Sequence, residues 1–321
     1  MSEGPRPGGP AYVERVASQI AGRPGVRLIV ILRAIGCAWA RRPDGGCTNC
    51  GFLRLSTGGA PVPAADLIAQ FDAAIDAPGA LDGVVEVDLY NSGSFLSDQE
   101  IPPAVRAHAL GRLGRTAVRR VLIESRPEHV RADKLTAARA LLGERELEVG
   151  IGLESCDDHV REVLVNKGFG RPEFERAVAT LGHVGARLLA YVLIKPLGLD
   201  EAAAVEDAVA SARYVFEVAA RAGVPARVAL EPVYVVPGTA LERAYRAGRY
   251  APASLWSVVE VVRRAHPVGE LLVGLSEESL EPAASPAGCP RCTAALRAAL
   301  VCYNATRDLA AFEGLDCPCR H

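Results

Sequence analysis

The sequence predicts an α/β protein built as a partial (β/α)6 TIM-type barrel, followed by a small C-terminal cysteine-rich extension. Short runs rich in β-branched residues alternate with Ala- and Leu-rich stretches of helical length, which is typical of βα units around a parallel sheet. Polar residues also gather where the predicted strands end. The extension is predicted by a linker rich in Pro, Ala and Ser and by the cysteines that follow it.

The predicted strands are short and apolar, and they cover residues 27–32, 84–89, 120–124, 147–153, 187–194, 227–233 and 271–275. The predicted helices lie between them, at residues 64–75, 102–113, 132–142, 172–184, 201–222 and 254–265. This order gives about six βα repeats and a final strand, so we expect an incomplete barrel. Residues 1–25 are expected to form an N-terminal arm, residues 26–280 the barrel, and residues 281–321 the cysteine-rich segment.

Polar side chains mark the ends of three predicted strands, and the carboxyl ends of barrel strands form the working face of such a fold. Glu124 and Arg126 end the third strand, Glu154 ends the fourth, and Lys195 ends the fifth. Each has a structural alternative, since a lone Glu can cap the following helix and a lone Lys can lie in solvent. Cys156 is expected at the same mouth, either as a hydrogen-atom donor or as a bystander.

The composition fits a chain that buries a large core and carries no export or membrane signal. It has 321 residues, a formal net charge of −2 and nine cysteines. No apolar run reaches the ~18 residues that a membrane-spanning helix needs. Cysteines in a chain without an export signal favour metal or redox chemistry over disulfides. We therefore expect a cytoplasmic protein with no membrane partner, and the near-neutral charge argues against non-specific binding to nucleic acid.

Cys37, Cys47 and Cys50 lie in one loop directly after the first predicted strand. Nine residues separate the first two cysteines, two separate the second from the third, and Gly51 and Phe52 follow. Three thiolates can hold three irons of a cubane cluster and leave the fourth iron open for chemistry. Structural metal sites are normally closed, so an open three-thiolate loop favours a reactive centre.

The C-terminal extension holds a second group of cysteines. Cys289 and Cys292 form a C-x2-C pair, Cys317 and Cys319 form a C-x-C pair, and Cys302 lies between the pairs on a predicted helix. Four thiolates can close a site on one ion or cluster, and such sites suit zinc or iron–sulfur. A structural zinc and an auxiliary iron–sulfur cluster are the two alternatives. Cys302 is either a fifth ligand or a small buried apolar residue.

The order of these features resembles the radical S-adenosylmethionine (SAM) enzymes. The commonest pattern of that superfamily has three residues between the first two cysteines and an aromatic residue before the third, whereas this chain has nine residues there and Asn49 before Cys50. Short segments in order resemble the subgroup that contains the radical enzyme of archaeosine synthesis and the radical domain of Elongator-type proteins. These segments are Gly36-Cys37-Ala38-Trp39, Cys47-Thr48-Asn49-Cys50-Gly51, Asn91-Ser92-Gly93-Ser94-Phe95, Glu124-Ser125-Arg126-Pro127-Glu128, Gly152-Leu153-Glu154-Ser155 and Asn166-Lys167-Gly168.

The resemblance implies a cofactor set and a set of site residues. Cys37, Cys47 and Cys50 would ligate a 4Fe–4S cluster, SAM would chelate the open iron, and one electron would release a 5′-deoxyadenosyl radical. A reductant such as ferredoxin or flavodoxin is implied as a partner. The turn at residues 92–94 stands where the family keeps a Gly-Gly-Glu-like turn for the SAM amine, but it lacks the acidic residue. The residues expected near SAM are Ser92, Gly93, Ser94, Glu124, Glu154 and Lys195.

Three functions compete on this basis. In the leading hypothesis Cys289, Cys292, Cys317 and Cys319 hold an auxiliary iron–sulfur cluster, with zinc as the alternative. The enzyme then inserts sulfur into a small nucleoside- or nucleotide-like substrate of specialised natural-product biosynthesis, or performs a related radical rearrangement. The second hypothesis is a tRNA-modifying C–N lyase of the archaeosine type, acting on a lysine adduct of a deazaguanine base. The third is a non-catalytic zinc-binding module. The lyase should have a basic surface path, for which the candidates are Arg41, Arg42, Arg54, Arg112, Arg115, Arg119 and Arg120.

Overall fold

The computed structural model describes residues 8–320, and the chain falls into two compact units. Of these residues, the first unit holds those up to Gly45, Phe52–Ile151 and Glu175–Leu188. The second unit holds Gly46–Gly51, Gly152–Phe174 and the residues from Leu189 onward. Each unit is described by itself.

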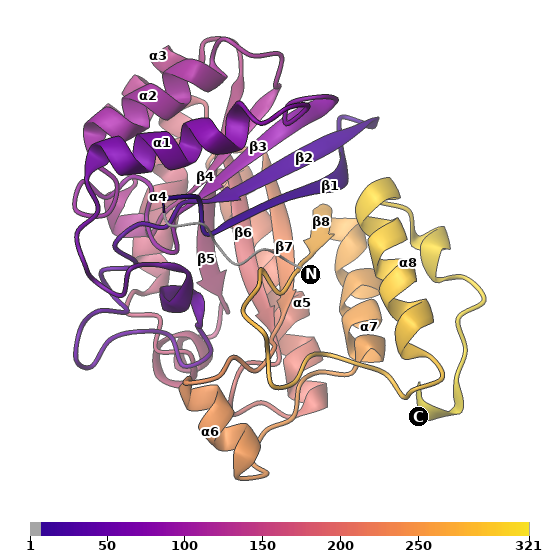
Figure 1. Cartoon of the computed structure of the whole chain (residues 1–321). Helices are drawn as coiled ribbons and strands as arrows, with labels where there is room; N and C mark the ends of the chain where they lie inside the picture. Colours follow the sequence, from indigo (N-terminus) through magenta and orange to yellow (C-terminus); the bar gives the residue numbers. More distant parts are fainter. Residues whose placement is uncertain (1–7, 321) are drawn as a thin grey trace. The chain divides into compact units, whose positions relative to one another are not determined.

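The first unit is a sheet covered by helices (Figure 1). Its strands are β1 (Tyr12–Ile20), β2 (Arg23–Ile31), β3 (Val84–Tyr90), β4 (Arg120–Glu124) and the part of β5 (Glu146–Glu154) up to Ile151. They pair in sequence order, β1 antiparallel to β2 and the others parallel. The connections between parallel strands carry α1 (Ala64–Ile75), α2 (Pro103–Leu113) and α3 (Ala132–Leu142), which lie side by side.

β1 is a strand in the region that the sequence predicted as an N-terminal arm. Ile20 pairs with Arg23, so only Ala21 and Gly22 form the connecting turn. Both turn residues have positive φ angles, of 50° and 73°, as a two-residue hairpin turn requires. The prediction of an arm is therefore wrong for Tyr12–Ile20, and residues 1–7 lie outside the described part of the chain. The sequence gives little warning, because the strand is short of apolar residues.

The second unit carries the last part of the sheet and four further helices. From Leu189 onward β6 (Arg187–Ile194) belongs to it, together with β7 (Ala226–Pro232) and β8 (Glu270–Val273), which pair in parallel. The helices are α5 (Glu201–Arg221), α6 (Ala240–Arg246), α7 (Leu255–Ala265) and α8 (Thr293–Thr306). α5 packs against α7, and α7 against α8. The remaining helix, α4 (Arg171–Val184), begins in the second unit and ends in the first.

Local sequence explains why these helices begin where they do. Asp200, Thr239 and Ser254 each precede a helix and accept a hydrogen bond from one of its first free backbone N–H groups. The strands are nearly continuous apolar runs, as is typical of parallel strands that are covered on both faces. A short π-helical turn, Val160–Leu164, precedes the Asn166-Lys167-Gly168 segment.

The α/β class predicted from the sequence is confirmed. Observed bounds coincide with the predicted ones for α1, α3, β4 and β6, and the other predicted strands and helices shift at their ends. The count of six βα units and the boundary near residue 280 stay predictions. Among residues 8–320, no helix has the length and apolar character needed to cross a membrane.

Candidate active site and metal centre

Cys37 lies in the first unit, in the loop that leaves β2. Gly36 enters the loop with a φ of 90°, and a Cβ there would lie 2.6 Å from Ser56 Oγ and 2.7 Å from Leu53 Cδ1. The Cys37 carbonyl accepts a hydrogen bond from the Arg41 backbone (3.2 Å), which closes a tight turn after the thiol. Glycine is therefore required in front of Cys37 both for its backbone angle and for space.

Cys47 and Cys50 lie in the second unit and are one turn apart, since Cys50 N donates to Cys47 O at 3.2 Å. Thr48 fixes this turn: its backbone N–H donates to Val165 O (2.9 Å) and its hydroxyl to Leu164 O (2.8 Å). Cys47 packs against the apolar cluster that includes Val165. The resemblance segment at residues 47–51 is therefore a packed turn.

Asn166 and Gly51, two further residues of the resemblance segments, also hold the turn at Cys47 and Cys50 in place. Asn166, with a φ of 58°, donates its side-chain amide to Gly46 O at 2.9 Å. A Cβ on Gly51 would lie 2.2 Å from Val236 Cγ1, so the chain passes too close to this side chain for any larger residue. The predicted cluster ligands thus lie on two firmly held segments, one in each unit, and their joint binding of a cluster stays a prediction.

The turn after β3 presents buried polar atoms that the described residues leave without partners. Asn91 is fully buried and Ser92 is 7% exposed. Within residues 8–320, Asn91 Oδ1 and Ser92 Oγ have no hydrogen-bond partner. Buried acceptors of this kind cost free energy unless something donates to them. The turn therefore fits a ligand that brings N–H donors, such as the ammonium of an amino acid.

A buried carboxylate, Glu100, lies directly beneath this turn. Its Oε2 accepts from Ser94 N (2.5 Å) and Asn91 Nδ2 (3.4 Å), and its Oε1 accepts from Ala38 N (3.0 Å). Glu100 is only 2% exposed. The sequence interpretation overlooked Glu100, because it stands outside every resemblance segment, in the loop before α2.

The segment after β4 braces the same turn. Phe95 N donates to Glu124 O (2.7 Å), and Arg126 N donates to Ser94 Oγ (3.1 Å). The Arg126 side chain pairs with Glu128 (2.6 Å) and lies over the ring of Trp39, 5.5 Å from its centroid. The Arg126 side chain thus pairs with Glu128, and the Glu124 carbonyl binds the backbone of the turn.

Two predicted site residues of the second unit are held in ion pairs. Glu154 Oε1 lies 2.5 Å from Lys167 Nζ, and Lys195 Nζ lies 2.6 Å from Glu201 Oε2. Burial raises the pKa of Glu201, but its hydrogen bond with Lys195 and two further donors lower it more, so the pair is ionised. Lys195 is therefore held in an ion pair and does not lie in solvent, and its contact with SAM stays a prediction.

Three of the predicted residues share an unusual backbone. Ser92 has a φ of 55°, Glu154 of 69° and Lys195 of 61°. They end β3, β5 and β6, or follow them within two residues. A left-handed conformation is strained for residues other than glycine, and such residues concentrate at functional sites.

Cys156 lies beside a buried polar group on α5. Its backbone N–H donates to Ser211 Oγ (2.8 Å), while Ser155 Oγ donates to Asp207 Oδ1 (2.6 Å). Burial raises the pKa of the Cys156 thiol and raises the pKa of Asp207 to about 6. The thiol is therefore neutral near pH 7.

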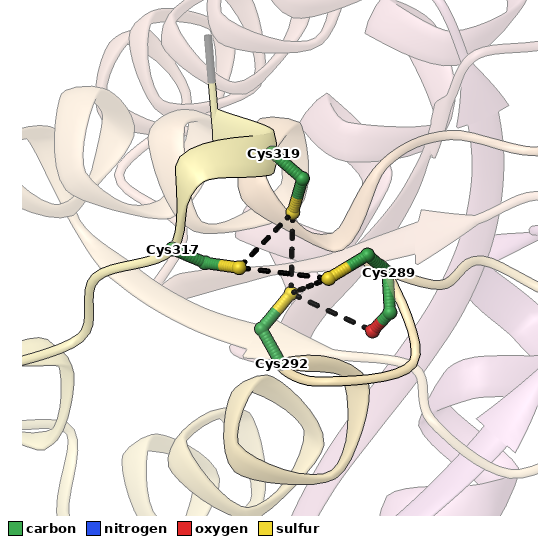
Figure 2. Close-up of side chains that lie close together, drawn as sticks. All are labelled: Cys289, Cys292, Cys317 and Cys319. Atoms are coloured by element: carbon green, nitrogen blue, oxygen red, sulfur yellow. Dashed lines mark hydrogen bonds between the residues drawn. The ribbon is translucent and has the colours of Figure 1, made fainter.

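Four cysteines of the C-terminal extension converge on one point (Figure 2). The Sγ atoms lie 3.7 Å apart for Cys289–Cys292, 3.5 Å for Cys289–Cys317, 3.4 Å for Cys292–Cys319 and 3.5 Å for Cys317–Cys319. All four lie within 4.8 Å of one another. Cys289 and Cys292 precede α8, and Cys317 and Cys319 flank the final turn. We call this group the tail tetrad.

The tail tetrad has the dimensions of a tetrahedral ligand set. A zinc–sulfur bond of about 2.3 Å gives a sulfur–sulfur edge of about 3.8 Å in a tetrahedral site. Four thiols can instead bind a cluster, but each sulfur of a cubane then binds a different iron and the sulfurs lie farther apart. The tetrad could thus hold a second metal centre, as the sequence predicted. Its sulfur–sulfur spacing favours a single zinc ion over an iron–sulfur cluster.

The protonation of the tetrad is uneven. A hydrogen bond from the Arg291 backbone lowers the pKa of Cys289 to about 6, and burial raises the pKa of Cys292 to about 12. A metal ion would deprotonate all four thiols on binding. Cys302 is exposed on α8 and stands outside the tetrad, so the alternative of a small buried residue is wrong, and a role as a fifth ligand stays a prediction.

Most of the arginines proposed for a basic path are not tested as a surface, but two are committed elsewhere. Arg120 is 3% exposed and pairs with Glu146 at 2.7 Å. Arg112 pairs with Asp72 (2.8 Å) and Asp76 (2.7 Å) on α1. Arg112 and Arg120 are therefore structural, and they drop out of the predicted path.

Comparison with known proteins identifies the family. The chain is 30% identical over 300 residues to archaeosine synthase subunit beta of Methanosarcina acetivorans, covering 91% of this chain and 82% of the relative. The chain belongs to the archaeosine synthase subunit beta family. It is a radical SAM enzyme of the archaeosine- and Elongator-like subgroup, as the resemblance predicted. The namesake of Thermococcus kodakarensis is 29% identical over 312 residues, covering 94% of this chain and 91% of the relative.

Solved structures agree on the fold. Methylornithine synthase (PylB) superposes with a TM-score of 0.52 at 14% identity, over 77% of this chain and 63% of that one. No protein-family model matches the chain.

Proposed function

We propose that this radical SAM enzyme modifies a deazaguanine base of tRNA, as a C–N lyase that acts on a lysine adduct of that base. The name of its relatives, archaeosine synthase subunit beta, supports a tRNA-modifying role over a free small substrate. The observation that carries the cofactor assignment is the turn after β3, where Asn91 Oδ1 and Ser92 Oγ are buried acceptors without partners among residues 8–320.

In this proposal Cys37, Cys47 and Cys50 hold a 4Fe–4S cluster, and SAM binds beside it. When bound, the pair supplies a radical that removes one hydrogen atom from the substrate. Asn91 Oδ1 and Ser92 Oγ would accept N–H donors from the SAM ammonium, a cation with three such donors. The absence of a side chain at Gly93 lets the backbone of the turn approach the Cys37 segment: a Cβ there would lie 3.1 Å from Cys37 N.

In this proposal Glu154, Lys167 and Cys156 of the second unit also contribute to the reaction site. Lys167 pairs with Glu154, which holds that carboxylate in one orientation at the end of β5. The neutral thiol of Cys156 is a group that could return a hydrogen atom, and its raised pKa keeps it protonated for that purpose.

The tail tetrad bears on the choice between the lyase and sulfur insertion. A single ion held by four thiolates contains no inorganic sulfide, so it has no sulfur atom to donate. The spacing of the four sulfurs favours such an ion, and we propose zinc with a structural role. A non-catalytic zinc module is not supported, because the family is that of a radical enzyme.

The test is a turnover experiment with tRNA that carries the lysine adduct. Anaerobically reconstituted protein is incubated with SAM, a reductant and this tRNA, and the digested nucleosides are analysed by mass spectrometry. We expect loss of the lysine portion from the base, with 5′-deoxyadenosine formed alongside. Formation of 5′-deoxyadenosine with a free nucleoside, but none with tRNA, would refute the tRNA substrate and retain the radical chemistry.

Binding of the tRNA gives an independent check. Contacts to phosphates release counterions, so the affinity for tRNA should fall steeply as the salt concentration rises. A salt-independent affinity would argue against a phosphate path. Arg41, Arg42, Arg54, Arg115 and Arg119 remain the candidates for it, and Arg42 lies over the ring of Trp39 at 5.6 Å in the Cys37 loop.

A further inference from the structure

We infer that Glu100 is a positioning residue for the cofactor site, because its carboxylate holds the Cys37 loop and the turn at residues 92–94 in one arrangement. This inference rests on the proposed function, because it assigns Glu100 to the cluster loop and to the SAM turn. Glu100 itself is six residues beyond Ser94, in the loop before α2.

The geometry links two segments through one side chain. Oε1 accepts the N–H of Ala38, the residue after Cys37, at 3.0 Å, and Oε2 accepts the N–H of Ser94 at 2.5 Å. The loop of a predicted iron ligand and the predicted SAM turn are thus held by opposite oxygens of the same carboxylate. All of these residues belong to the first unit. Movement of Glu100 would therefore change the position of Cys37 relative to the turn.

Glu100 also sets the orientation of Asn91. The Asn91 amide nitrogen donates to Glu100 Oε2 at 3.4 Å, which directs Oδ1 away from the carboxylate. Oδ1 is then the free acceptor that the turn offers to a ligand, with no partner among the described residues. Without the carboxylate the amide could turn over and present N–H groups to the ligand ammonium, which would repel it.

Only a side chain that accepts hydrogen bonds at two oxygens suits this position. Three N–H donors converge on Glu100, and a carboxylate accepts at both oxygens. A glutamine has one acceptor oxygen and one NH2 group, so in either orientation at least one N–H would face another N–H. Because the site is 2% exposed, water cannot relieve that conflict.

Gly93 provides a second route to the same perturbation. A Cβ at Gly93 would lie 2.0 Å from Glu100 Oε2, so Gly93→Ala must displace the carboxylate while leaving it charged. The matched control is Gly111→Ala on α2, where the added Cβ meets only Leu141 Cδ2 at an ordinary 3.7 Å. The matched control for the charge is Asp98→Asn, two residues before Glu100, whose carboxylate pairs with Lys134 at 3.0 Å and with Arg106.

The experiment measures SAM binding and not turnover. The four variants and the wild-type chain are reconstituted anaerobically, their iron is counted, and the reduced cluster is titrated with SAM while its EPR spectrum is recorded. We expect Glu100→Gln and Gly93→Ala to raise the Kd of SAM about tenfold or more and to alter the EPR signal of the SAM-bound cluster. Asp98→Asn and Gly111→Ala should match the wild type in both.

The outcomes separate the inference from the proposed function. A wild-type chain that binds no cluster or no SAM would overturn the proposed function, and this inference with it. A wild-type chain that binds both, with Glu100→Gln unchanged in Kd and EPR signal, would overturn the inference alone. Should Glu100→Gln fail to fold, Gly93→Ala decides in the same way, and a wild-type Kd and EPR signal for it would overturn the inference.

Discussion

The tail tetrad makes the sharpest prediction, which is that it binds one metal ion. Four of its six sulfur–sulfur edges run from 3.4 to 3.7 Å. Closing these edges on a tetrahedral ion at a bond length of about 2.3 Å requires them to lengthen to about 3.8 Å, a change of a few tenths of an ångström. Holding a cubane would require the two cysteine pairs to separate much further, since each sulfur must reach its own iron.

The perturbation is Cys292→Ser with Cys319→Ser, which removes one ligand from each cysteine pair. Cys302→Ser is the matched control, because Cys302 is exposed and stands outside the tetrad. α8 buries Leu296, Ala299, Leu300 and Tyr303, so we expect the barrel and α8 to stay folded. The melting temperature should fall by a few degrees, as is typical when about 1 kcal/mol is lost from a chain of this size.

The assay is metal and sulfide content, with X-ray absorption at the zinc edge. We expect one zinc per wild-type chain with four sulfur ligands at about 2.3 Å, absent from the double variant and retained in Cys302→Ser. The reasoning from spacing is refuted if the double variant instead loses about four irons together with acid-labile sulfide. Sulfur insertion would then return as the leading function.

Three further predictions follow from the site. Replacing Cys37, Cys47 and Cys50 together by alanine should remove about four irons per chain and leave the tail zinc in place, as metal analysis would measure; retained iron would contradict the assignment of the cluster. Gly51→Ala should destabilise the chain by about 1–3 kcal/mol in urea unfolding, because its Cβ would lie 2.2 Å from Val236 Cγ1. Burial raises the pKa of Asp207 from 3.8 to about 6, so its proton favours folding and wild-type stability should fall by up to about 3 kcal/mol as the pH rises from about 4 to about 7. Urea unfolding at the two pH values should show no such decline for Asp207→Asn. The control Glu206→Gln should keep the decline, because Arg264 lowers the pKa of the Glu206 carboxyl. An equal decline in Asp207→Asn would refute the raised pKa of Asp207.

Local patterns in the sequence predicted most of the fold. Apolar runs and Ala-rich stretches placed α1, α3, β4 and β6 at their observed bounds, since these elements bury continuous apolar faces. β1 was missed because its sequence, Tyr12–Ile20, is only partly apolar and gains its place by pairing with β2. The two-residue turn Ala21-Gly22, with positive φ at both residues, then joins the two strands.

In the candidate site, too, local sequence patterns predicted some residues, and contacts made only in the folded chain determine the others. The tail tetrad could be predicted because cysteine spacing reports the chemistry directly. Glu100 could not, because its importance depends on hydrogen bonds to Ala38 and Ser94, and nothing in the spacing of residues reports such contacts. The partners of Glu154 and Lys195 were missed for the same reason, since Lys167 and Glu201 become neighbours only through the folded chain.

Ser92, Glu154 and Lys195 have left-handed backbone conformations, so selection for stability and selection for activity should favour different residues at these positions. Glycine at any of the three would relieve backbone strain of about 1–2 kcal/mol, so a library screened only for heat resistance should enrich glycine there. The same library screened for turnover should reject glycine wherever the side chain contributes to the reaction. Comparing the two enrichments at each position would therefore separate side chains kept for chemistry from those kept for shape.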